Sequence, residues 1–188
     1  GAEGAEGGEI TFGAVSPERL AVPEILWLPL SGAGGGLWQV ALGDVAVGPA
    51  RLRLCGGGCR AALDTGTGVI AGPAALISAV LAALNVDPAC GNYRDLPALG
   101  FALAGATLHL DPSDYVERSA AGCSPRLLAL DAPAAAGPPV VLLGAPFLER
   151  YYSVYDAGSL RVGLGLARHA PLPGTNETAA QPAARLVV

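Results

Sequence analysis

Residues 61–68, Ala-Ala-Leu-Asp-Thr-Gly-Thr-Gly, bring one carboxylate directly from a short apolar run into a turn of small and hydroxyl residues. The apolar residues predict a buried approach, and Thr and Gly suit a tight turn. Two interpretations follow: Asp64 is an ordinary turn residue that accepts hydrogen bonds from its own backbone, or it is a carboxylate held in place for chemistry. Because the tripeptide Asp-Thr-Gly favours neither by itself, the flanking sequence has to distinguish them.

The composition of the 188-residue chain favours a globular fold rich in short elements. Hydrophobic residues make up 52% of the chain and charged residues 14%, while 27 Gly and 16 Pro approach a quarter of it. This Gly and Pro content disfavours a helical bundle and predicts many tight turns. The apolar fraction excludes a disordered chain, and no apolar run reaches the roughly 18 residues of a membrane span. The net charge of −5 comes without a basic stripe, which argues against a nucleic-acid partner.

The chain divides into a folded part and two ends. We expect a flexible N-terminal segment at 1–8, which contains only Gly, Ala and Glu, and a loose tail at 170–188. Residues 9–169 form the folded unit. The chain contains no Met, so we expect it to be a processed chain or an excerpt of a longer product.

Within the folded unit, the hydrophobic pattern predicts one helix and a series of strands. Pro73 suits a first helical turn, apolar residues recur at helical spacing from Leu76 to Leu84, and Asn85 suits the helix end. Ala104-Gly105 predicts the turn of a β-hairpin. The expected strands are 9–13, 25–30, 37–47, 100–103, 106–110, 127–130, 140–143, 152–155 and 160–164.

Four cysteines allow three disulfide pairings, and their spacing favours one of them. Cys55 and Cys59 enclose three glycines, a stretch flexible enough to close a small ring, which leaves Cys90 to pair with Cys123. Two structural disulfides indicate an oxidising compartment. The sequon Asn176-Glu177-Thr178 is a candidate glycosylation site and agrees with a secretory route.

Other kinds of catalytic site find little support in the sequence. The chain has no Cys-x-x-Cys pair and only two histidines, His109 and His169, so a metal site is not expected. Neither histidine lies near a nucleophile and base, which argues against a Ser-His-Asp mechanism. The remaining aspartates lie in turn-like contexts and are interpreted as solvated or capping groups: Asp44, Asp87, Asp95, Asp111, Asp114, Asp131 and Asp156.

A series of motifs surrounds residues 61–68 in a fixed order. A Cys-x-x-x-Cys ring precedes the Asp-Thr-Gly, Gly72-Pro73 begins the helix after it, and Leu96-Pro97 lies between the second pair of cysteines. The further motifs are Trp27-Leu28-Pro29 and Leu37–Val40 upstream, and Leu142-Leu143-Gly144, Phe147, Tyr151-Tyr152, Asp156 and Val162-Gly163 downstream. In this arrangement, from Glu9 to Leu166, the chain resembles the C-terminal lobe of the pepsin-like aspartic proteases, peptidase family A1.

The resemblance implies a mainly β fold, a single lobe of a bilobed protein with a few short helices. It also implies that Asp64 is one of two catalytic aspartates in an endopeptidase acting at acidic to mildly acidic pH. Two adjacent carboxylates share a proton, so that one acts as a base on water while the other hydrogen-bonds or protonates the substrate carbonyl. No second Asp-Thr-Gly or Asp-Ser-Gly occurs in the chain. We therefore expect it to be inactive without the N-terminal lobe.

The resemblance assigns further residues to this site. The supporting residues are Thr65, Gly66, Thr67, Leu142, Leu143 and Gly144. The substrate subsite comprises Gly66, Thr67, Gly68 and Leu142. Many family members carry a hydroxyl residue where Gly68 stands, so one contact to the substrate backbone is lost here. The implied partners are the N-terminal lobe and a peptide or protein substrate, with no cofactor and no metal, in an extracellular setting or an acidic vesicle or vacuole.

Two other classes of function stay open. A catalytically inactive aspartic-protease-like binding or inhibitor module would keep the fold and bind a peptide or partner instead of cleaving it. The intact Asp64-Thr65-Gly66-Thr67 argues against this, because binding alone does not require a carboxylate in a cleft. A homodimer whose symmetry supplies the second Asp is less favoured, because the chain is longer than such a protomer needs.

Overall fold

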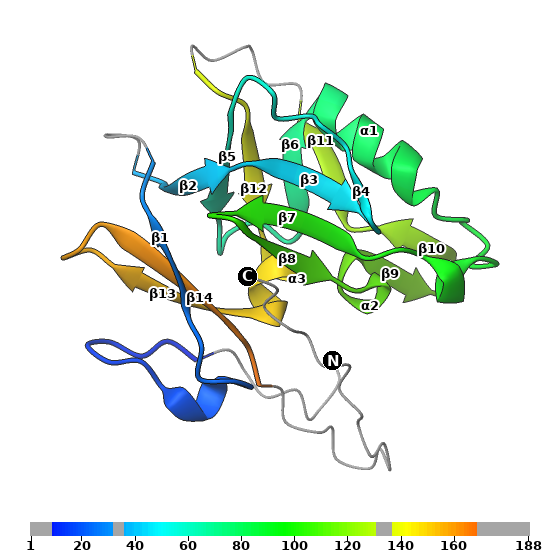
Figure 1. Ribbon diagram of the computed structural model, residues 1–188. Coiled ribbons are helices and arrows are strands. Elements are labelled where there is room, and N and C mark those ends of the chain that lie inside the picture. The colour runs from blue at the N-terminus through cyan, green and yellow to red at the C-terminus, as the bar shows by residue number, and fades with distance from the viewer. Residues whose placement is uncertain (1–8, 32–35, 131–136, 169–188) are drawn as a thin grey trace.

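The computed structural model describes residues 9–31, 36–130 and 137–168 and is mainly β (Figure 1), which confirms the expected fold class. In this part of the chain, no helix is long and apolar enough to cross a membrane. Several predictions fall outside the described residues: the segments 1–8 and 170–188, the sequon at Asn176, His169 and Asp131.

A five-stranded mixed sheet carries the turn at residues 61–68. Its strand order is β11-β6-β12-β5-β2, and β12 pairs parallel with β5 and antiparallel with β6. The turn after β5 and the end of β12 therefore lie at the same edge of the sheet. The strands are β2 (Trp38–Leu42), β5 (Cys59–Leu63), β6 (Ile70–Pro73), β11 (Leu127–Leu130) and β12 (Val140–Leu143).

A four-stranded antiparallel sheet of order β4-β3-β7-β8 packs with the first one. Its strands are β3 (Asp44–Val47), β4 (Ala50–Arg51), β7 (Leu99–Leu103) and β8 (Ala106–Leu110). The expected hairpin between β7 and β8 is confirmed: Ala104 and Gly105 have φ values of 47° and 85°, as a two-residue hairpin turn requires.

Two smaller sheets complete the β structure. The three-stranded sheet β1-β14-β13 lies to one side in Figure 1, and β9 pairs with β10. Leu160, expected in a strand, instead lies in the turn before β14, with φ 49°. The strands are β1 (Leu26–Pro29), β9 (Val116–Ser119), β10 (Gly122–Pro125), β13 (Tyr151–Asp156) and β14 (Arg161–Leu166).

The expected helix is confirmed as α1 (Ala74–Leu84), which packs on β6 and β11. It begins after Pro73 and ends at Asn85, which adopts the left-handed conformation with φ 47°. The sequence did not predict the two shorter helices, because each is too short for a helical period to show. The remaining helical elements are α2 (Pro112–Tyr115), α3 (Ala145–Arg150), η1 (Pro17–Arg19) and η2 (Tyr93–Asp95).

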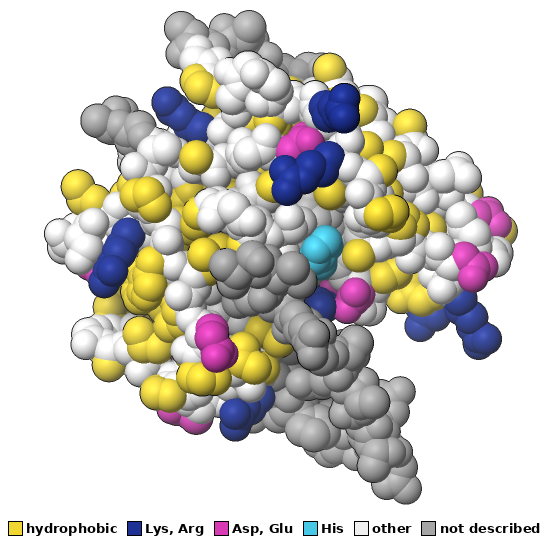
Figure 2. Space-filling model, viewed as in Figure 1, with side chains coloured by type: hydrophobic (Ala, Val, Ile, Leu, Met, Phe, Trp, Pro, Cys, Tyr) yellow, Lys and Arg dark blue, Asp and Glu magenta, His cyan; other side chains and the backbone are white. Residues whose placement is uncertain are grey.

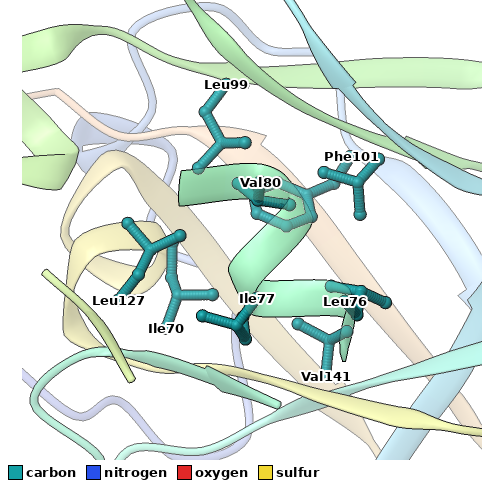
Figure 3. Close-up of a pocket in the computed structure, with 9 residues that line it drawn as sticks. Ile70, Leu76, Ile77, Val80, Leu99, Phe101, Leu127 and Val141 are labelled. Carbon is teal, nitrogen blue, oxygen red and sulfur yellow. The ribbon is translucent and has the colours of Figure 1, made fainter. Parts of the chain in front are cut away.

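A cavity of about 10 Å³ remains in the core between α1 and the sheets (Figure 3). Its lining side chains are all apolar, so it offers no hydrogen-bond partner to water or to a polar ligand. We interpret it as a packing gap. The residues that line it are Val45, Ile70, Leu76, Ile77, Val80, Leu99, Phe101, Leu127 and Val141.

Both expected disulfides are confirmed. Cys55 pairs with Cys59 across the glycine ring, and Cys90 pairs with Cys123 across 33 positions of sequence. The longer one ties the segment after α1 to β10, where the Cys123 N–H also donates to the carbonyl oxygen of Pro88 at 2.9 Å.

Two of the expected strands are wrong. Residues 9–13 form no strand: Ile10 and Phe12 are 82% and 91% exposed, because no strand of the described chain pairs with them. The run 37–47 is two strands in different sheets, divided at Gly43, whose N–H donates to the carbonyl oxygen of Ala102 at 2.8 Å. Both parts of the run have strand-like sequence, so the change of sheet at Gly43 could not be recognised locally.

Candidate active site

Asp64 opens the loop between β5 and β6 and stays attached to the neighbouring strand. Its N–H donates to the carbonyl oxygen of Leu143 at 3.1 Å. Leu63, which precedes it, is buried and pairs in register with Leu143 of β12. The buried strand thus delivers the carboxylate to the sheet edge, where Asp64 is half-buried.

Two hydrogen bonds from within the loop hold the carboxylate. The Thr67 hydroxyl donates to Oδ2 at 2.6 Å, and the Gly66 N–H donates to Oδ1 at 2.9 Å. Hydrogen bonds to the ionised form favour it. The Thr67 hydroxyl, followed by the Gly66 N–H, therefore holds the pKa of the Asp64 carboxyl below its ordinary value, against a smaller opposing effect of burial.

The junction of β12 and α3 lies directly behind this loop. Gly144 is buried, and a Cβ atom at this position would overlap the carbonyl oxygens of Thr67 and Val69. The N–H of Ala145 donates to the carbonyl oxygen of Thr67 at 2.8 Å. Glycine at position 144 thus permits a backbone-to-backbone approach that fixes the first half of the loop.

The outer rim of the loop is open. Thr65, Gly66 and Gly68 are exposed, and no atom lies within 4 Å of the position that a Cβ of Gly68 would occupy. Of the two leucines before Gly144, Leu143 is fully buried, whereas Leu142 is half-buried and pairs in register with Ala62 and Ala71. The structure therefore brings every residue predicted for the site to one edge of the sheet.

The aromatic pair Trp38 and Tyr155 lies beside this edge and was not predicted from the sequence. Their rings meet edge to face, with centroids 5.2 Å apart, and Trp38 pairs in register with Leu63. Burial, with the Asp64 charge as a smaller cause, raises the pKa of the Tyr155 hydroxyl. No local motif marks this contact, because it joins β2 to β13.

Two other aspartates, Asp44 and Asp156, hold loops or turns through hydrogen bonds, and Asp44 is not solvated as expected. Asp44 is 6% exposed and accepts the N–H groups of Arg53 and Leu54 at 2.8 and 3.0 Å. Asp156 accepts the Ser159 N–H at 2.9 Å and pairs with Arg161 at 2.8 Å. Burial of Asp44 was missed because the loop that it holds is nine residues away in the sequence.

Within the described ranges, no three His, Cys, Asp or Glu side chains come together in a way that could hold a metal ion. On the face shown in Figure 2, the arginines lie in separate groups and form no continuous stripe.

The fold and this loop define the class of the molecule as an aspartic-protease lobe. Residues 1–167 match the family described as Eukaryotic aspartyl protease, and the chain belongs to that family. It is 33% identical to gastricsin of Mus musculus over 86% of this chain and 43% of the relative. It is 37% identical to napsin-A of Homo sapiens, over 87% and 41%, and 34% identical to cathepsin E-A of Xenopus laevis, over 85% and 41%. The chain thus spans about two fifths of the length of these relatives.

Proposed function

We infer that this chain is the C-terminal lobe of a bilobed aspartic endopeptidase and supplies Asp64 as one of its two catalytic aspartates. The observation that carries this is the Asp64 carboxylate, which accepts two hydrogen bonds from its own loop while Thr65, Gly66 and Gly68 around it are exposed. A carboxylate with only a turn-forming role does not need an open rim.

The chemistry needs a second carboxylate close to the first. One of the pair accepts a proton from water, which then attacks the peptide carbonyl, while the other donates a hydrogen bond or a proton to the carbonyl oxygen. The two titrate as one unit, so their apparent pKa values belong to the pair. The substrate subsite comprises exposed Gly66 and Gly68, the half-buried Thr67 between them, and Leu142 beside them.

The second carboxylate comes from an N-terminal lobe. The chain covers about two fifths of the length of its relatives, which leaves room for a lobe of similar size. Ile10 and Phe12 expose two apolar side chains at alternate positions, and in the described chain β13 pairs only with β14. A further β unit would cover both features, and the two disulfides support a secretory or vesicular setting for the assembled protein.

The experiment is peptide cleavage by the complete two-lobed protein at acidic pH. Asp64→Asn keeps the size of the side chain and an acceptor for Thr67 but removes one of the two carboxyl groups that share the proton, so turnover is expected to be lost while the thermal unfolding midpoint changes little. Asp95→Asn, at an exposed position of η2, is the matched control and should retain activity. Normal turnover by Asp64→Asn would refute the role of Asp64. A wild-type protein that binds peptides without cleaving them would favour the binding or inhibitor module instead.

A further inference from the structure

Arg126 connects the Asp64 loop to two helices that are distant from it in sequence. Its Nη2 donates to the carbonyl oxygen of Gly68 at 3.4 Å, and its Nη1 donates to the carbonyl oxygen of Asp114 at 3.4 Å and to Oε2 of Glu149 at 3.0 Å. The side chain is 25% exposed. One guanidinium therefore contacts the loop, α2 and α3 together.

The backbone of Arg126 is fixed on both sides. Its N–H donates to the carbonyl oxygen of Tyr115 at 2.7 Å, and its carbonyl oxygen accepts the Ile70 N–H at 2.9 Å. The guanidinium thus extends from an anchored position, and its planar fork presents several donors in a fixed geometry. Because the backbone is anchored and the fork is planar, the side chain loses less conformational entropy when it holds three acceptors at once.

Neighbouring ion pairs also hold the guanidinium in place. Glu149 pairs with Arg126, while the adjacent Arg150 pairs with Asp111 at 2.8 Å and with Asp114 at 2.7 Å. Because Arg150 has its own acidic partners, it does not compete for Glu149. The second guanidinium nitrogen of Arg126 is therefore directed at Gly68.

The two halves of the loop are anchored differently. The first half is held by the backbone of the β12–α3 junction, through the contact of the Ala145 N–H with Thr67. The second half has open space where a side chain of Gly68 would be. It is held by Arg126, whose carbonyl oxygen accepts the Ile70 N–H and whose guanidinium donates to the carbonyl oxygen of Gly68. The bonds to the Asp64 carboxylate come from residues within three positions of it, so the whole loop moves with its anchors.

We propose that Arg126 is a positioning residue for Asp64: by holding the carbonyl group of Gly68, it keeps the loop and its carboxylate aligned with the second catalytic aspartate and the substrate. The inference rests on the proposed catalytic role of Asp64. It predicts that Arg126 acts mainly on kcat, since alignment of the carboxylates limits the chemical step more than binding of the peptide.

The test compares Arg126→Met, Arg126→Lys and the control Arg161→Met in the complete two-lobed protein. Arg161 also pairs with an aspartate, at 2.8 Å, and stacks on Trp27, 4.1 Å from the ring centroid, but both of these partners lie outside the Asp64 loop. Arg126→Met is expected to lower kcat about five-fold or more with KM nearly unchanged. Arg126→Lys, which retains one donor group, should recover part of kcat, and Arg161→Met should stay within about two-fold of wild type.

A second readout does not depend on activity. Hydrogen–deuterium exchange of the peptide covering residues 64–70 should be about five-fold faster in Arg126→Met than in wild type, with no such change in Arg161→Met. Unchanged exchange and unchanged kcat in Arg126→Met overturn the proposal, as does an equal loss of kcat in the Arg161 control. If Arg126→Met does not fold, the test uses Arg126→Lys instead. Wild-type exchange and wild-type kcat in Arg126→Lys overturn the proposal, whereas faster exchange with a lower kcat supports it. If the wild-type protein cleaves no peptide but exchange in the loop is still faster in the Arg126 variants, the proposed function is refuted. The role of Arg126 in holding the loop is then still supported.

Discussion

At the scale of single residues, the Asp64 carboxylate depends on a hydroxyl three positions away. Thr67 donates to it at 2.6 Å, and this bond is the largest cause of the lowered pKa of Asp64. The bond contributes to function by favouring the ionised carboxylate and by fixing its orientation. The Thr67 hydroxyl contributes to the site through this contact, while the Thr67 carbonyl oxygen accepts the Ala145 N–H.

Thr67→Val in the complete protein tests this contribution. Valine keeps the shape but cannot donate, so the pKa of Asp64 should rise and the acidic limb of the pH–rate profile should move to higher pH. We expect kcat/KM to fall roughly ten-fold, the effect of losing a hydrogen bond to a charged group. Thr107→Val, at a half-buried position of β8, is the control. An acidic limb at the wild-type position would contradict the argument.

Gly144 is the second single residue on which the geometry of the loop depends. Alanine at this position would overlap the carbonyl oxygens of Thr67 and Val69, so the loop or α3 must move. We expect Gly144→Ala to lower the free energy of unfolding by about 1–3 kcal/mol, measured by urea denaturation of the chain. Gly56→Ala, where no atom lies within 4 Å of the new Cβ, should change it by less than about 0.5 kcal/mol. A similar decrease in the free energy of unfolding in both variants would show that the close approach at Gly144 does not contribute to stability.

At the scale of elements, the β13–β14 hairpin depends on Asp156 at its turn. The Ser159 N–H, and after it the side chain of Arg161, lower the pKa of Asp156 to about 2. The folded-state pKa is below the ordinary value of about 3.9. The ionised carboxylate therefore stabilises the fold above about pH 4, and this contribution is lost as the pH falls toward 2.

Asp156→Asn removes the stabilisation by the ionised carboxylate at every pH. The thermal unfolding midpoint of the variant is expected to lie below that of wild type between about pH 5 and pH 7. The two midpoints should converge as the pH falls toward about 2, because the wild-type carboxylate becomes protonated over that range. A difference that stays constant down to that pH would exclude the carboxylate as its cause.

At the scale of the whole molecule, the two disulfides restrict the unfolded chain to different degrees. Cys55 and Cys59 are four positions apart, whereas Cys90 and Cys123 are 33 apart. The entropy lost by the unfolded chain grows with the length of the closed loop. The longer disulfide therefore contributes more to stability.

Paired Cys→Ser substitutions measure the two contributions separately. Removing Cys90–Cys123 should lower the free energy of unfolding by about 3–4 kcal/mol, and removing Cys55–Cys59 by about 2 kcal/mol. Urea denaturation of both double variants of the chain gives the comparison. A larger decrease in the free energy of unfolding on removal of Cys55–Cys59 would mean that loop length does not determine which disulfide stabilises more.

The sequence by itself determined the fold class, α1, the hairpin at Ala104-Gly105 and both disulfide pairings. It also indicated which loop carries the carboxylate. These features depend on periodicity, turn residues and spacing, which act over a few positions or follow a fixed order of motifs. They can therefore be recognised without knowing which distant segments meet.

Only the tertiary structure decided the features that depend on distant segments. It divided the run 37–47 between two sheets at Gly43, gave residues 9–13 no partner strand within the described ranges and buried Asp44. It also placed the guanidinium of Arg126 against Gly68, 58 positions away. Such contacts arise when the core brings strands together, and the stabilisation comes from burial and backbone pairing rather than from local preference. These contacts cannot be recognised from the sequence of either segment alone.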